Sequence, residues 1–189
     1  MKKPKLSFNS PVVLIFALIS FIALVLNYVT AGQSNVVFFM TRHTPLTSPL
    51  TFVRFFTHVL GHGGFEHYIG NMAYLLLLGP MLEEKYGSTK ILGVIVLTAF
   101  ITGVISYIIF PNIALCGASG VVFAFILLTS FTSFKAGDIP VTVILVALIY
   151  IGQQVYEGIF LRDNISNFSH VLGGIVGAVI GYNWNKKKG

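Results

Sequence analysis

A serine, two histidines and an asparagine are the residues of this chain whose types and spacing point to chemistry. Ser119 stands between two glycines in the apolar stretch ALCGASGVVFAF. His67 and Asn71 are four residues apart and share one helical face, and His170 precedes another apolar run. Serine is a weak nucleophile until a base takes its proton, and imidazole, with an ordinary pKa of about 6.5, suits that task. The set is therefore a candidate for nucleophilic catalysis in which an imidazole activates Ser119.

The glycines that flank Ser119 favour this interpretation. Gly117 and Gly120 free the backbone for an unusual turn and permit a close approach by another group. A serine at the start of a helix also lies beside backbone N–H groups that can hold a developing oxyanion. A buried serine alone more often packs closely or bonds back to a carbonyl, so the assignment depends on its neighbours.

The composition of the 189-residue chain is that of a membrane protein. Hydrophobic residues make up 55% of it, charged residues only 10%, and the mean hydropathy is +0.84, far from the balance of a soluble globular domain. The net charge of +6 comes from residues dispersed over short loops and ends, so it does not indicate nucleic-acid binding. Cys116 is the sole cysteine, which excludes an internal disulfide.

Apolar stretches long enough to span a membrane recur along the chain. A hydrocarbon layer about 30 Å thick needs roughly 20 such residues per helix. The predicted spans are 11–29, 65–82, 91–110, 113–134, 139–161 and 165–184. We therefore expect an all-α membrane protein, a bundle of six transmembrane helices. Its predicted parts are an N-terminal tail 1–10, a core 11–184 with an interfacial loop near 30–64, and a basic tail 185–189.

The loop charges predict how these spans are oriented. Nine lysines fall on the side of the two termini, against Arg42, Arg54 and Arg162 on the other side. Because positively charged loops stay in the cytoplasm, both termini are expected there. The second, fourth and sixth spans then all run inward from the outer face.

The polar residues of these three spans lie near their outer ends. His67 and Asn71 open the second span, Ser119 comes early in the fourth and His170 early in the sixth. At about 1.5 Å per residue, the four are expected at a similar depth. Polar groups in lipid are costly unless they face the bundle interior or a wet cavity, which makes these residues functional candidates.

A stripe of glycines follows the candidate base. The segment VLGGIVGAVIG places Gly173, Gly177 and Gly181 four residues apart on one helical face. Such a face lets helices approach almost backbone to backbone, and against the fourth span it would bring His170 within reach of Ser119. The alternative is a simple association motif beside an unrelated histidine, which leaves the shared depth of the polar residues unexplained.

Three motifs resemble the signatures of the rhomboid family of intramembrane serine proteases. They are GASG at 117–120, HGGFEHYIGN at 62–71 and SHVLGGIVG at 169–177. The resemblance covers nearly the whole chain, and the order and placement of the motifs are specific. It implies a compact six-helix core in which Ser119 is the nucleophile and His170 the general base of a dyad that works through an acyl-enzyme.

The resemblance also implies roles for surrounding residues. His67 and Asn71 match family positions that stabilise the oxyanion together with backbone N–H groups around Ser119. Gly117 lies in the loop that shapes this hole. Phe123 stands where family members often carry a tyrosine under the histidine ring, so stacking is expected to survive without the phenolic hydrogen bond.

Two charged residues around the core also match positions of the family. Arg54 matches the arginine of a family Trp-Arg pair, in which Val53 replaces the tryptophan, and Glu83 resembles a structural acid at the turn into the third span. The segment TFVRFFTHVLG is expected to form a helix in the outer leaflet that either deforms the bilayer or caps the bundle. Glu157 either borders a water path or lateral substrate entrance, or reaches toward lipid headgroups.

Together these features predict an intramembrane serine endopeptidase in a bacterial plasma membrane, with an active site open to the outside. Its expected substrates are single-span membrane proteins, cut near the outer membrane boundary where small or helix-breaking residues let the segment unwind. No metal or other cofactor is expected. The expected partners are these substrates and the lipid bilayer, and not nucleic acid.

Two other functions remain open. A metal or haem protein would use His58, His62, His67 and His170 as ligands, although glycines interrupt the chain between His62 and His67. A proteolytically inactive rhomboid relative would serve as a membrane binding or quality-control module, although both Ser119 and His170 are present.

Overall fold

The computed structural model describes residues 8–132, 140–160 and 164–186. The elements within them are α1 Pro11–Val29, the π-helical turn η1 Asn35–Phe39, α2 Pro49–Thr57, the 3-10 turn η2 His58–Leu60, α3 Phe65–Tyr86, α4 Ser88–Ile109, α5 Ser119–Ser130, α6 Val141–Phe160 and α7 Asn164–Lys186. These described residues form no strand, only an isolated bridge between Thr41 and Leu115. The all-α class predicted from the sequence is confirmed.

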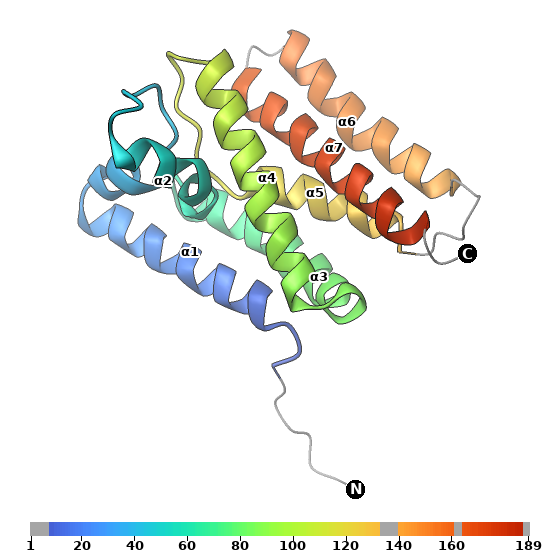
Figure 1. Cartoon of the computed structure of the whole chain (residues 1–189). Coiled ribbons are helices and arrows are strands. Elements are labelled where there is room, and N and C mark those ends of the chain that lie inside the picture. Colours follow the sequence, from blue (N-terminus) through green and yellow to red (C-terminus); the bar gives the residue numbers. More distant parts are fainter. Residues whose placement is uncertain (1–7, 133–139, 161–163, 187–189) are drawn as a thin grey trace, which may run out of the picture.

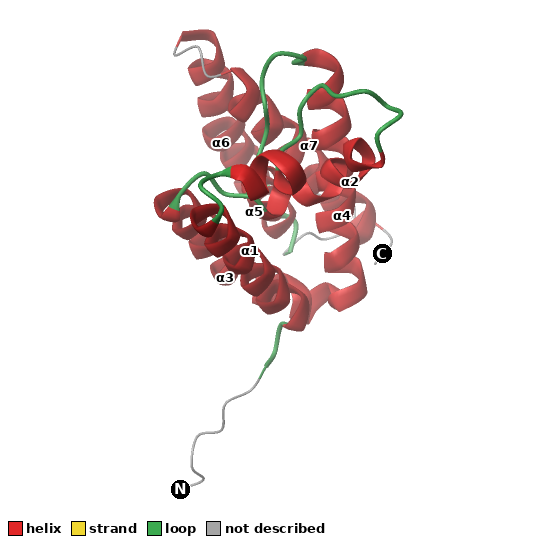
Figure 2. Cartoon of the chain, turned by 90° about the vertical axis from the view of Figure 1, so that its left-hand side faces the viewer, coloured by secondary structure: helices red, strands yellow, loops and turns green. Residues whose placement is uncertain are grey.

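The long helices pack as a bundle in which successive helices run in opposite directions (Figure 1). α1, α4 and α6 run one way, and α3, α5 and α7 run the other. The starts of α3, α5 and α7 therefore share the end of the bundle where α2 lies, and long loops gather there (Figure 2). α5 forms the centre of the core, since Val121, Ala124, Phe125 and Leu128 are fully buried.

Glu83 joins three helix ends at the opposite end of the bundle. Its buried carboxylate accepts hydrogen bonds from the N–H groups of Val12 (3.0 Å) and Val13 (3.1 Å) in the first turn of α1. It also accepts one from the Ser88 hydroxyl (2.7 Å) at the start of α4. A carboxylate at a helix N-terminus is favourable because it pairs with free N–H groups and the positive end of the helix dipole.

The loop between α1 and α3 contains the amphipathic helix expected from its sequence. In α2, Arg54 and Phe55 are buried, whereas Phe52 and Phe56 are exposed on the other side. The guanidinium Nε of Arg54 donates to the carbonyl oxygen of Val37 (2.8 Å), which ties α2 to η1. The helical form of this segment is confirmed, and its position in the outer leaflet stays a prediction.

The start of the fourth predicted span is wrong. Helix α5 begins only at Ser119. Gly117 adopts φ 128°, in the positive-φ region that glycine alone adopts readily, so the helix cannot extend back through it. Before it, Leu115 is extended and exchanges backbone hydrogen bonds of 2.9 Å with Thr41 in both directions. The stretch is apolar on both sides of this break, so hydropathy does not mark it.

Two described helices, α1 and α4, are both long and apolar enough to cross a membrane by length and composition. Ser119–Ser130 and Val141–Gln153 are shorter apolar helices. α3 continues to Tyr86, past the predicted limit at residue 82, with Pro80 inside it. The number of spans, the domain limits and the cytoplasmic side of the termini stay predictions.

Candidate active site

The α5–α7 interface brings two helices into backbone contact. A Cβ atom added at Gly173 would lie 2.7 Å from the carbonyl carbon of Gly120, and one added at Gly177 would lie 2.7 Å from that of Ala124. Such distances are far inside van der Waals contact, so only glycine permits this approach. The predicted glycine face therefore packs directly on the helix of the predicted nucleophile.

This contact holds the imidazole of His170 near the start of α5. Ser119 is the first residue of α5, and Phe123 lies one turn later on the same face. The rings of Phe123 and His170 are stacked, with centroids 4.5 Å apart and planes 4° from parallel. Both Ser119 and His170 are half-buried. The stack thus positions the imidazole on the face of α5 that carries the serine.

Gly117 shapes the turn that leads into α5. A Cβ atom at this position would lie 2.7 Å from both Cε1 and Nε2 of His67, so glycine leaves the space that the His67 ring fills. The N–H of Gly117 donates to the carbonyl oxygen of His58 (2.9 Å). Gly117 therefore supplies the shape of the turn, while its own N–H is engaged within the protein.

The start of α5 offers other backbone donors. The first hydrogen bond of the helix runs from the N–H of Val122 to the carbonyl of Ala118 (3.0 Å). The N–H groups of Ser119, Gly120 and Val121 precede it and have no acceptor within the helix. Because Ser119 is the first residue of α5, these N–H groups belong to the same helix start and are suited to stabilise negative charge that develops on a substrate oxygen there.

His67 and Asn71 lie on one face in the first turns of α3. The Asn71 side chain is buried, and its Nδ2 donates to the backbone carbonyl of His67 (2.9 Å). An amide nitrogen carries two N–H bonds, so a second donor remains for a ligand. Since the His67 ring contacts Gly117, α3 presents both residues beside the turn that precedes Ser119.

Comparison with known proteins agrees with this arrangement. The rhomboid domain pattern matches residues 49–186, which is most of the chain. The chain belongs to the rhomboid family. Rhomboid-related protein 2 of Mus musculus is 30% identical over 159 residues, covering 72% of this chain and 52% of that protein.

Bacterial rhomboids are similarly related. Rhomboid protease GlpG of Haemophilus influenzae is 29% identical over 133 residues, covering 68% of each chain. Rhomboid protease GluP of Bacillus subtilis is 28% identical over 166 residues, covering 85% of this chain and 31% of the relative. The chain thus spans about half the length of the mouse relative and less of the Bacillus one. Rhomboid membership and the apolar helices make this a membrane protein.

Among the remaining histidines of this rhomboid, His58 is a structural residue. Its Nδ1 lies 3.1 Å from the carbonyl oxygen of Arg54, and its Nε2 lies 3.2 Å from Oγ1 of Thr102 on α4. Burial lowers the pKa of His58 to about 4, although hydrogen bonds to backbone carbonyls oppose the shift. The ring is therefore neutral at pH 7 and holds α2 against α4.

The metal or haem alternative gains no support from the geometry. Within the three described segments, no three His, Cys, Asp or Glu side chains are grouped to hold a metal ion. His58 uses both ring nitrogens inside the protein, and His62 directs Nδ1 to the carbonyl of Leu60 (3.1 Å). The side chain of Glu157, for which a water path, a lateral substrate entrance or a headgroup contact was predicted, lies outside the described part of the chain.

Two predicted supporting residues make structural contacts, and one of them, Glu83, lies away from Ser119. Glu83 lies near the end of α3, at the far end of the bundle from the serine. Arg54 lies in α2, where its Nη1 lies 3.4 Å from Oγ1 of Thr44. The contacts of both residues are structural, since they join elements that surround the site.

Sequence reasoning missed two residues near the candidate site, Asn167 and Tyr150. Asn167, one turn before His170 on α7, is 5% exposed, and its Nδ2 has no hydrogen-bond partner among the described residues. A polar residue three positions before the predicted base was a signal for it. Tyr150 of α6 meets the Phe123 ring edge to face, with centroids 6.1 Å apart. No sequence pattern marked this contact.

Proposed function

We propose that this rhomboid is an intramembrane serine endopeptidase that cleaves single-span membrane proteins near the outer membrane boundary. The observation that carries the proposal is the stacking of the His170 ring on Phe123, one turn after Ser119, across a glycine-packed interface. An imidazole held over the same face as a helix-terminal serine is the pair that nucleophilic catalysis requires. The names of the bacterial relatives support a protease.

In the first half of the reaction, Ser119 Oγ attacks the carbonyl carbon of the scissile peptide bond while His170 takes the hydroxyl proton. The oxyanion accepts hydrogen bonds from the second Asn71 N–H, a ring N–H of His67 and the backbone at the start of α5. Collapse of this intermediate breaks the C–N bond. The departing amine receives the proton from His170, and an ester on Ser119 remains.

In the second half, water attacks the ester while His170 takes one of its protons. The same N–H groups donate hydrogen bonds to the new oxyanion. Its collapse returns the proton from His170 to Ser119 and releases the substrate fragment as a carboxylic acid. Substrate residues near the cleaved bond must be unwound, because a helical peptide bond is protected by its own hydrogen bonds.

Covalent labelling and cleavage test this proposal. The protein is purified in detergent and treated with a fluorophosphonate probe or with a single-span test substrate. We expect Ser119→Ala to abolish labelling, and Ser119→Ala and His170→Ala each to lower cleavage by about a thousandfold or more. His67→Ala and Asn71→Ala should each lower kcat by roughly ten- to a hundredfold, because one oxyanion donor is lost.

Matched control variants distinguish a loss of catalysis from a loss of the folded structure. Ser20→Ala removes a buried serine of α1, and His43→Ala removes an exposed histidine of the outer loop. Both should retain activity, and a chelator should leave it unchanged. Cleavage that persists in Ser119→Ala or His170→Ala would refute the dyad, and an unlabelled, inactive wild type would favour a non-proteolytic rhomboid.

We also propose that both termini face the cytoplasm and that Ser119 opens toward the outside. The distribution of charges supports this orientation, with Lys85 and Lys90 on one side and Arg42 on the other. In a Cys116→Ala background, an impermeant maleimide applied to intact cells should label Arg42→Cys and spare Lys90→Cys. Labelling of Lys90→Cys but not of Arg42→Cys would show that the termini face the outside.

A further inference from the structure

A groove lies along the last turns of α7, at the end of the bundle opposite the candidate active site. It has a volume of about 290 Å³ and is lined by Phe131 at the end of α5 and by Ala178, Val179, Tyr182 and Asn183 of α7. We call it the α7 groove. Because Ser119 begins α5 and the helix rises about 1.5 Å per residue, the groove lies roughly 18 Å from the serine along the axis of α5.

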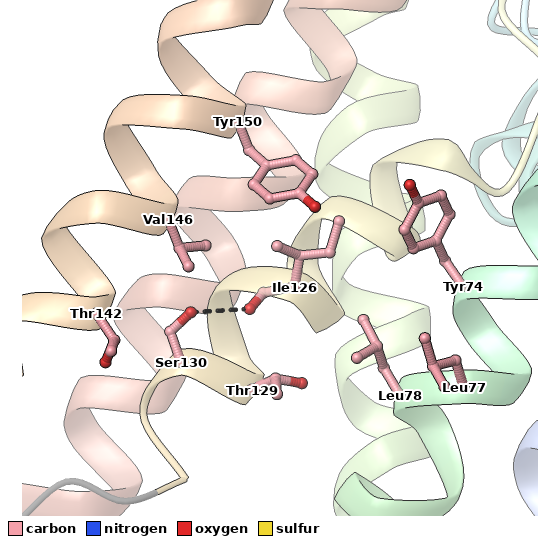
Figure 3. A pocket seen from close by; sticks show the side chains of 9 residues that line it. All are labelled: Tyr74, Leu77, Leu78, Ile126, Thr129, Ser130, Thr142, Val146 and Tyr150. Carbon is pink, nitrogen blue, oxygen red and sulfur yellow. Dashed lines mark hydrogen bonds between the residues drawn. The ribbon is translucent and has the colours of Figure 1, made fainter.

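The α7 groove is separate from the groove between α3 and α6. The latter has a volume of about 350 Å³ and is lined in part by Tyr74 of α3 and by Val146 and Tyr150 of α6 (Figure 3). Tyr150 also meets Phe123, the residue that stacks on His170. The groove between α3 and α6 therefore adjoins the candidate active site, whereas the α7 groove shares no lining residue with that site.

One line of side chains along α7 runs through this groove and changes from apolar to charged. Ile175, Val179, Tyr182 and Lys186 are spaced by four, three and four residues, so they share one face of the helix. All four are exposed. The Nζ of Lys186 lies 5.6 Å from the centre of the Tyr182 ring, within the range of a cation–π contact. The line therefore has the order of a phospholipid, with an apolar part, an interfacial part and a charged end.

Lys186 lies at the depth expected for lipid headgroups. The predicted span 165–184 ends two residues before it. Tyrosine and tryptophan are typical of the membrane interface, and the rings of Tyr86 and Trp184 meet at this end of the bundle with centroids 5.0 Å apart. At about 1.5 Å per residue, Lys186 lies roughly 4.5 Å beyond Asn183, the last residue of the groove. A phosphate beside Lys186 can therefore belong to a lipid whose acyl chain lies in the α7 groove.

The charges at this end of the bundle favour an anionic lipid over a neutral one. Five lysines belong to the ends of α3 and α7 and the start of α4, namely Lys85, Lys90, Lys186, Lys187 and Lys188. Against them stand two described acids of α3, Glu83, which is buried and engaged within the protein, and Glu84, which is exposed. Lysine clusters beside the end of a membrane helix attract anionic headgroups.

Asn183 adds a hydrogen-bond donor between the apolar part of the groove and Lys186. Its Nδ2 donates to the carbonyl oxygen of Val179 (2.9 Å), which occupies one of the two N–H bonds of the amide. The second N–H can donate to an ester carbonyl of a phospholipid, because these esters lie between the acyl chains and the phosphate.

We infer that the α7 groove and Lys186 form a binding site for an anionic phospholipid. An acyl chain lies along Val179 and Phe131, Asn183 donates to an ester carbonyl, and Lys186 pairs with the phosphate. The lipid binds the far end of the helix that carries His170, so it stabilises the folded bundle without contacting the reacting groups. The site goes beyond the proposed protease function and does not depend on it.

The single tryptophan of the chain, Trp184, makes the site measurable. In a Trp184→Phe background, Val179→Trp places the sole indole in the α7 groove. Val96→Trp is the matched control, since Val96 is an exposed valine of α4 at a similar distance from the helix end, and Thr89 rather than a lysine ends its face. Each protein is reconstituted in mixed vesicles of phosphatidylglycerol and phosphatidylcholine, one of which carries brominated acyl chains that quench tryptophan fluorescence on contact.

We expect the indole at position 179 to favour phosphatidylglycerol over phosphatidylcholine about fivefold, and the indole at position 96 to favour it less than about twofold. Lys186→Gln should remove the preference at position 179, and Lys186→Arg should keep it. Lys90→Gln removes the same charge from α4, outside the groove, and should leave the preference at position 179 unchanged.

Specific outcomes would overturn the inference. Equal preferences at positions 179 and 96, or equal losses from Lys90→Gln and Lys186→Gln, would mean that surface charge attracts the lipid without a defined site. A preference that survives Lys186→Gln would remove the lysine from the site. An indole at position 179 that neither brominated lipid quenches would show that protein covers the groove, as in contact with a second copy of the chain.

Thermal unfolding in a neutral detergent tests the stabilising effect without any catalysis. Added phosphatidylglycerol should raise the Tm of the natural sequence by about 2–4 °C relative to added phosphatidylcholine. Lys186→Gln should abolish this difference, and Lys90→Gln should retain it. Equal Tm values in the two lipids, or the same loss in both variants, would contradict a lipid site at the end of α7 whether or not the protein cleaves substrates.

Discussion

The two sides of α5 are built in opposite ways. Toward α7, the helices meet at backbone distance, because Gly173 and Gly177 leave no side chain between them. Toward α3 and α6, the same helix borders a groove of about 350 Å³. The side toward α7 fixes the position of His170 relative to Ser119. The side toward α3 and α6 leaves open space beside α5. The proposed protease function requires the first of these properties, a rigid pair of reacting groups.

The largest effect is expected where the tight side is forced open. Gly177→Val adds a branched side chain whose Cβ would lie 2.7 Å from the carbonyl carbon of Ala124. The α5–α7 pair must then separate, and we expect the free energy of unfolding to fall by about 3 kcal/mol. Titration with SDS from mild detergent micelles, followed by circular dichroism, measures this change.

The control is a glycine of α6 in open surroundings. No atom lies within 4 Å of a Cβ added at Gly152. Gly152→Val should therefore leave the unfolding midpoint close to that of the wild type. Similar losses from both substitutions would mean that backbone contact does not distinguish the two sides of α5.

An effect of similar size is expected on acidification, at the contact between α2 and α4. The pKa of His58 is about 4 in the folded protein, below its ordinary value, so the unfolded chain binds a proton there more readily. The stabilisation that results is complete above about pH 6.5 and is lost as the pH falls toward 4, by up to about 3 kcal/mol. Unfolding titrations between pH 7.5 and about pH 4 should show the decline.

His58→Gln provides the matched variant, since glutamine keeps hydrogen-bonding capacity near Thr102 and does not titrate in this range. This variant is expected to be less stable at pH 7.5 and to lose less stability on acidification. A decline as steep as that of the wild type would show that another group causes it.

The residues that the sequence identified share a simple physical basis. Polar side chains in an apolar chain are conspicuous, and periodic glycines predict close helix contact, so Ser119, His170 and the glycine stripe were found without coordinates. The start of α5 was missed, because the chain is apolar on both sides of Gly117 and its positive φ leaves no mark in hydropathy.

The open side of α5 was not predictable from the sequence. Tyr74 lies on α3 and Thr142 and Tyr150 lie on α6, and their convergence depends on how these two helices are spaced around α5. Spacing between helices is set by three-dimensional packing, which periodicity along one helix does not encode. Asn167 is similar, because its burial depends on neighbours from other helices.

A moderate effect is expected where the two sides meet, at Phe123. Phe123→Leu keeps an apolar side chain but removes the stack on His170 and the contact with Tyr150. Aromatic pairs contribute about 1 kcal/mol, so kcat should fall about fivefold while KM changes little. Phe123→Tyr keeps the ring, so its kcat should stay close to that of the wild type. A change in KM alone would indicate that Phe123 contacts substrate rather than positioning the imidazole.

The smallest effect is expected on the stability of the open side. Val146→Phe places a larger side chain into a groove that already has room for it, so the free energy of unfolding should change by less than about 0.5 kcal/mol. The SDS titration used for Gly177→Val measures it under identical conditions. A loss comparable to that of Gly177→Val would mean that the groove is filled by packing in the folded protein, and the contrast between the two sides of α5 would disappear. An unchanged midpoint would mean that the residues around this space contribute little to holding the helices together.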